Sequence, residues 1–104
     1  MVNIPLRYTI PLDDIEHIVG KIEVYNRTIS VYERWKERNG EYQYVDEKIL
    51  ELTNTLCEYM IARCYCQEGA RTYGRGDGIY AKVKAEFEKE FPFREFPLLE
   101  EPIK

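Results

Sequence analysis

Three side chains able to bind an anion recur at helical spacing in the second half of the chain. Arg63, Gln67 and Arg71 follow one another at intervals of four residues, which places them on one face of a helix. A guanidinium binds phosphate or carboxylate oxygens through paired hydrogen bonds, and backbone N–H groups of the glycine-rich loop that follows can add donors. The pattern predicts a basic pole that binds a nucleotide or other small anion. Its candidate ligand-binding residues are Arg63, Gln67, Arg71, Tyr73, Arg75 and Gly76.

A structural role for Arg63 is the competing interpretation. Its direction around the helix falls between Leu52 and Leu56, on the apolar side, where an unpaired guanidinium is costly. We expect Arg63 either to pair with Asp14 or Glu16 across a helical hairpin or to extend to the edge of the interface. The glycine-rich loop matches neither the Walker phosphate-binding pattern nor the dinucleotide fingerprint, so no sequence motif supports the anion site.

The cysteine and histidine residues predict neither a metal site nor a catalytic pair. The three cysteines lie on one predicted helix at spacings other than the three or four residues that let helical ligands share an ion. A mixed site that combines Asp13 and His17 with Cys64 and Glu68 has acceptable spacings and is the remaining alternative. No orienting group marks a nucleophile beside His17. We expect no enzymatic activity, no metal and no cofactor.

The overall charge limits the partners of this 104-residue chain. A net charge of −4 disfavours a nucleic-acid binder, although five basic residues stand against two acidic ones between residues 63 and 84. Stacking of bases on tyrosines beside that basic segment is the alternative that would suit single-stranded nucleic acid. No apolar run is long enough to span a bilayer, no signal segment opens the chain, and free thiols are typical of reducing compartments. We expect a cytoplasmic protein without membrane contact.

Hydrophobic periodicity predicts an all-α fold with a single domain. Its central helix covers residues 46–70, where apolar positions occupy more than half of the circumference and therefore need neighbours on several sides. A helix over 13–39 carries a heptad seam from Ile15 to Tyr32, and the short connection between the two makes them an antiparallel hairpin. A short third helix is predicted over 78–91.

Both ends of the chain are expected to be extended arms. In residues 1–12, apolar and polar side chains alternate, and Pro5 and Pro11 cannot donate ladder hydrogen bonds, which is typical of an edge strand or an arm. No second convincing strand lies nearby. The arm is therefore expected to lie as an extended strap over the helices or, as the alternative, to pair with another chain. The tail, residues 92–104, is expected to be a second strap. Its predicted anchors are Phe93, Phe96, Leu98 and Leu99.

A second apolar strip on the first long helix predicts an interaction surface. Val24, Val31 and Trp35 lie about 100° or more from the centre of the heptad seam, so a single partner helix cannot cover both faces. Tyr42 and Tyr44 in the hairpin turn add aromatic area of the kind that recognition surfaces use.

The predicted interaction surface indicates a function in protein binding. The chain is predicted to be a small non-enzymatic protein-interaction module, which means an adaptor, an inhibitor or a regulatory subunit, and to act as a homodimer or larger oligomer with a protein partner. The alternative is a ligand-binding protein that captures a nucleotide or other small anion at the basic pole.

Overall fold

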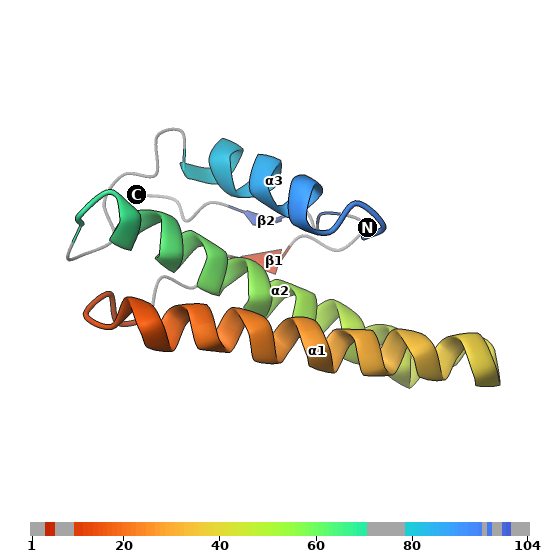
Figure 1. The fold of residues 1–104 in the computed structure, drawn as a ribbon. Coiled ribbons are helices and arrows are strands. Elements are labelled where there is room, and N and C mark those ends of the chain that lie inside the picture. The colour runs from red at the N-terminus through yellow and green to blue at the C-terminus, as the bar shows by residue number, and fades with distance from the viewer. Residues whose placement is uncertain (1–3, 6–9, 71–78, 95, 97–98, 101–104) are drawn as a thin grey trace.

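The fold consists of two long helices, one short helix and a minimal strand pairing (Figure 1). The computed structural model describes residues 4–5, 10–70, 79–94, 96 and 99–100. The elements in chain order are β1 (Ile4–Pro5), α1 (Ile15–Asn39), α2 (Gln43–Gln67), α3 (Ile79–Glu90) and β2 (Leu99–Glu100). The predicted all-α class, with a hairpin of long helices and a short third helix, is confirmed.

Both ends of α1 lie where the sequence can satisfy free backbone groups. Oδ1 of Asp14 accepts a 3.0 Å hydrogen bond from the backbone N–H of His17, so Asp14 caps the helix. The helix therefore begins at Ile15, two residues after the predicted start at residue 13. Gly40 has a φ of 84°, which side chains other than glycine adopt only with strain. The predicted end at Asn39 is therefore confirmed.

The beginning of α2 was predicted three residues too late. The helix starts at Gln43, and the residue before it, Tyr42, makes no capping bond with its side chain. Asp46, the first residue of the predicted helix, instead lies inside the first turn and forms an ion pair with Lys36 of α1. That hydrogen bond raises the pKa of Lys36 and lowers the pKa of Asp46. Asp46 thus contacts the other helix of the hairpin and does not cap its own helix. Sequence spacing alone does not reveal this contact.

The end of α2 lies at Gln67, three residues before the predicted end at residue 70. Gly69 has a φ of 79°, and its N–H donates to the carbonyl of Cys66. The N–H of Ala70 donates to the carbonyl of Tyr65, which completes a Schellman arrangement. The helix therefore ends just before Gly69, because glycine adopts the left-handed conformation without strain.

α2 is the central element of the core, packed against α1 and α3. In Figure 1 the hairpin projects well past the end of α3. We call the covered half the base, and we call residues 31–50 the tip. The prediction that the central helix needs cover on several sides is confirmed at the base, where Leu56, Cys57, Met60 and Ile61 are at most 2% exposed. Their neighbours in the core cluster include Ile18, Ile22, Ile29, Val83 and Phe87.

The short strand β1 pairs with β2 in parallel, with Ile4 beside Leu99. The alternative in which the arm pairs with another chain does not hold for Ile4 and Pro5, because the tail of the same chain supplies their partner. Sequence pattern could not show this pairing, since each strand is only two residues long. The rest of the alternating segment, residues 6–9, and the predicted anchor Leu98 lie outside the described residues.

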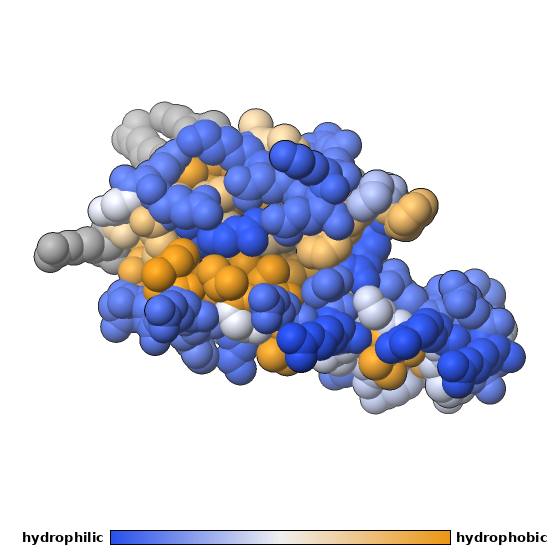
Figure 2. Space-filling model, viewed as in Figure 1, coloured by the Kyte–Doolittle hydropathy of each residue, from blue (hydrophilic) through white to orange (hydrophobic). Residues whose placement is uncertain are grey.

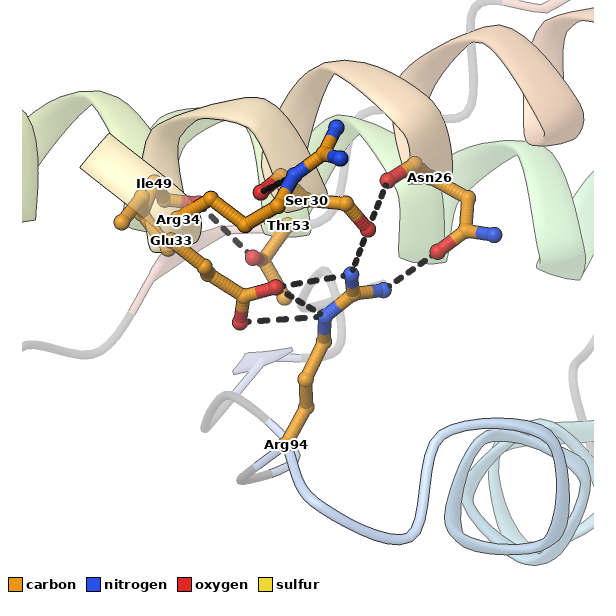
Figure 3. Close-up of polar contacts among 7 residues, drawn as sticks. All are labelled: Asn26, Ser30, Glu33, Arg34, Ile49, Thr53 and Arg94. Carbon is orange, nitrogen blue, oxygen red and sulfur yellow. Dashed lines mark hydrogen bonds and ion pairs between the residues drawn. The ribbon is translucent and has the colours of Figure 1, made fainter. Parts of the chain in front are cut away.

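Arg94 anchors the described part of the tail to α1 (Figure 3), whereas Phe93 does not. The guanidinium of Arg94, 11% exposed, donates to both carboxylate oxygens of Glu33, to Oγ of Ser30 at 2.9 Å and to Oδ1 of Asn26 at 2.6 Å. Phe93 is 99% exposed, so its prediction as an anchor is wrong. The turn after α3, closed by the N–H of Arg94 on the carbonyl of Phe91, directs adjacent side chains to different sides. Phe96 is partly buried against the core, as predicted, and the side chain of Leu99 is not described.

Candidate functional site

The basic pole is neutralised where the structure describes it. Nη2 of Arg63 lies 3.2 Å from Oε2 of Glu86 and 3.1 Å from Oε1 of Glu90, both on α3. The predicted pairing with Asp14 or Glu16 is therefore wrong, because α3 and not α1 covers this side of α2. The two carboxylates balance the positive charge of Arg63, although among the described residues its Nε is buried without a hydrogen-bond partner.

The groove beside Arg63 is lined by charges of both signs. Gln67 lines it together with Cys64, Glu68, Lys82, Ala85 and Glu86. Lys82 forms an ion pair with Glu68, and this hydrogen bond raises the pKa of Lys82. Burial, followed by the nearby Glu86 carboxylate, raises the pKa of Cys64 to about 11, so the thiol stays protonated. The groove therefore offers an anion no unpaired cation among its described residues.

The other four candidate ligand-binding residues, Arg71, Tyr73, Arg75 and Gly76, lie outside the described residues. The anion-binding interpretation stays a prediction. Within the described part of the chain, no three His, Cys, Asp or Glu side chains gather as metal ligands do, which removes the mixed site of Asp13, His17, Cys64 and Glu68. Burial also raises the pKa of Cys57 well above its ordinary range, as expected for an unreactive core thiol.

The five candidate interaction residues are exposed, although they are apolar or aromatic. The exposed fractions are 51% for Val24, 55% for Val31, 41% for Trp35, 55% for Tyr42 and 60% for Tyr44. We call Val24, Val31 and Trp35 the outer strip, because they lie on the side of α1 that faces away from the seam. In Figure 2, small apolar patches interrupt the charged surface over α1. The exposure of these side chains does not test binding, so the interaction surface stays a prediction.

The aromatic residues of the tip form one cluster. The rings of Trp35 and Tyr42 lie 5.9 Å apart between centroids, and those of Tyr42 and Tyr44 lie 6.3 Å apart. The turn at Gly40 brings the two helices together here, which places the start of α2 against the last turns of α1. The cluster extends the outer strip around the end of the hairpin.

Charged residues beside the outer strip were not singled out from the sequence. Arg34 and Arg38 line a shallow groove with Val31, Trp35 and Asn39. Ile15 and Val19, both about two-fifths exposed, line another groove with Glu16, Gly20 and Glu23. A helical projection of charged residues, and not only of apolar ones, would have found this border.

None of the helices in the described segments combines the length and apolar character that a membrane span requires. Comparison of the chain with models of known protein families, with curated proteins and with solved structures found no match.

Proposed function

We propose that this chain is a small non-enzymatic protein-interaction module, an adaptor, inhibitor or regulatory subunit, that acts as an oligomer. The observation that carries the proposal is the exposed outer strip together with the aromatic cluster at the tip. Tryptophan and tyrosine dominate the binding energy of protein interfaces, because they bury a large area and lose few rotamers. Their position at the uncovered end of the hairpin leaves them available to a partner.

The energetic argument concerns the outer strip. Burying a valine or a larger apolar side chain contributes roughly 1.5–3 kcal/mol relative to its exposed state. Single exposed valines are ordinary on protein surfaces, but Val24, Val31 and Trp35 recur on one side of the same helix. Association through this side would recover stabilisation that the isolated chain does not have.

Sedimentation equilibrium across a wide range of protein concentrations tests the proposal. Trp35 is the only tryptophan of the chain, so its emission reports directly on the proposed surface. We expect the average mass to rise with concentration while the emission of Trp35 shifts to shorter wavelength. A monomer of constant mass, with an emission that does not change, contradicts the proposal.

A matched pair of variants assigns the effect to the outer strip. Val31→Ser removes apolar area at a position that is 55% exposed, and serine and valine have similar helix propensities. Glu51→Ser changes an exposed residue on the polar side of α2 and serves as the control. We expect Val31→Ser to lower the average mass at a given concentration, whereas Glu51→Ser leaves it unchanged.

A further inference from the structure

The charges that border the outer strip change sign along α1. At about 100° per residue, Glu16, Gly20, Glu23, Arg34 and Arg38 fall within about 60° of one another around the helix axis. The two glutamates lie in the first half of α1, and the two arginines lie in its second half. One flank of the outer strip is therefore acidic towards the N-terminal end and basic towards the C-terminal end.

Most of these charges have no ion-pair partner in the described part of the chain. Arg34 and Arg38 form no ion pair there, and neither does Glu16. Arg34 donates one hydrogen bond to the carbonyl of Ser30, which leaves its positive charge unneutralised. Paired cations line the base of the molecule, whereas the cations of this flank are open to carboxylates from outside.

The first half of the strip also carries a gap in its side-chain surface. A Cβ atom built on Gly20 would meet nothing within 4 Å. Trp35, the largest side chain of the strip, lies fifteen residues further along the same helix. A bulky residue and an open position thus stand on the same side of α1, near opposite ends.

We propose that the outer strip binds the same strip of a second copy of this chain in antiparallel orientation. When two α1 helices overlap over their whole length, the symmetry axis passes near Arg27, the middle of Ile15–Asn39. Arg38 then lies opposite the partner's Glu16, and Arg34 lies within one turn of the partner's Glu23. This inference rests on the proposed function, for which it names the partner and the register.

The same overlap also fits the shapes of the two strips. Trp35 comes within one turn of the partner's Gly20, where the missing side chain leaves room for an indole. Val24 comes within one turn of the partner's Val31. A two-fold interface requires a surface that is complementary to itself, and this strip meets that requirement in both charge and shape.

The same charges disfavour a parallel arrangement of the two copies. Two parallel copies would place arginine against arginine and glutamate against glutamate, which costs free energy. In the antiparallel arrangement only Arg27 meets its own equivalent near the axis. Each Arg27 is held 3.6 Å from Glu23 of its own helix, which reduces that repulsion.

Charge reversal in trans tests the proposal. Arg38→Glu and Glu16→Arg each place two pairs of like charges in a symmetric dimer, so each is expected to weaken dimerisation roughly tenfold. An equimolar mixture of the two variants restores opposite charges on both sides of the interface. We expect the mixture to form heterodimers with an affinity near that of the original chain, measured by sedimentation equilibrium.

Two controls separate the possible outcomes. Glu51→Arg makes the same change of charge on the polar side of α2 and is expected to leave dimerisation unchanged. Circular dichroism of each variant shows that it is folded, and the mixture reports on pairing even where Glu16→Arg lowers helix stability. If the original chain associates but the mixture binds no better than either variant alone, the antiparallel register is wrong while the proposed function stands. If the original chain never associates, both fail.

Discussion

The base and the tip of the hairpin are built from the same two helices but differ in how they are covered. At the base, Leu56, Met60 and Ile61 of α2 are at most 2% exposed. At the tip, Leu50 and Tyr44 of the same helix are 41% and 60% exposed. The difference arises because α3 has only 12 residues, whereas α1 and α2 have 25 residues each.

This contrast shows that an apolar helical face does not by itself create a core. Most of the buried residues of α2 lie where a third element closes over the α1–α2 pair, and at the tip Val45 is buried at 5% exposure. Arg94 stands at the border, since it joins the turn after α3 to the α1 residues Asn26, Ser30 and Glu33. Beyond this contact the tip depends on the hairpin itself and on ion pairs such as Lys36 with Asp46. Stability is therefore expected to depend mainly on the base, and association on the outer strip of α1 together with the tip.

The largest expected effect is at the base. Phe87→Ala removes a fully buried ring that packs edge-on against Phe91 and Phe96 at centroid distances of 5.2 and 5.3 Å. Truncation of a buried phenylalanine costs about 3–5 kcal/mol, because apolar contact is lost and a cavity remains. Urea denaturation measures this loss as a lower unfolding midpoint. A loss below about 1 kcal/mol would mean that α3 is not an essential cover of the base.

The next effect is at the border between the two regions. Arg94→Met retains the length of the side chain but removes all hydrogen bonds to Asn26, Ser30 and Glu33, and we expect a loss of about 2 kcal/mol. Arg94→Lys should recover only part of it, since an ammonium cannot reproduce the planar fork of donors. Equal stability of the Met and Lys variants in urea would show that packing, and not hydrogen bonding, anchors the tail.

The buried thiols of α2 predict a smaller effect that depends on pH. The pKa of Cys64 is raised from an ordinary value of 9.0 to about 11 by burial and by Glu86. The stabilising contribution is therefore fully present below pH 9.0 and is lost as the pH rises towards 11, at up to about 1.4 kcal/mol per pH unit.

The pH effect is measured by denaturation at a series of alkaline pH values. Cys64→Ala removes this titrating group, so its unfolding free energy should fall less steeply over the same interval than that of the original chain. If the unfolding free energies of the two proteins fall equally with rising pH, the burial of the Cys64 thiol does not contribute to the difference between base and tip.

The smallest effect on stability is expected at the tip. Tyr44→Ala changes a side chain that is 60% exposed and should alter the unfolding free energy by less than about 0.5 kcal/mol. The same change should weaken association, because Tyr44 belongs to the aromatic cluster. Urea denaturation measures the loss of stability, and sedimentation measures the loss of association, for both Tyr44→Ala and Phe87→Ala. A loss of stability close to that of Phe87→Ala would abolish the distinction between base and tip.

Sequence reasoning succeeded where one helix or one residue type decides the outcome. The seam residues Ile18, Ile22 and Ile29 are buried as their heptad spacing predicts, whereas Ile15 at the start of the predicted seam is 40% exposed. The exposure of Val24 and Trp35 follows from the same projection. Helix ends were predicted well at Gly40 but less well at Tyr42, where no side chain caps the helix. At Gly69 the stabilising hydrogen bonds are also local, yet the end of α2 lies three residues before its predicted position.

The partners of individual side chains could not be predicted in the same way. The sequence by itself determined that Arg63 lies on an apolar side and needs a counter-charge, because helical projection requires only the spacing of residues. The choice of Glu86 and Glu90, the anchoring by Arg94 and the pairing of β1 with β2 depend on how α3 and the tail fold back. Only the tertiary structure decided these, since each contact joins residues far apart in the chain and no local preference specifies them.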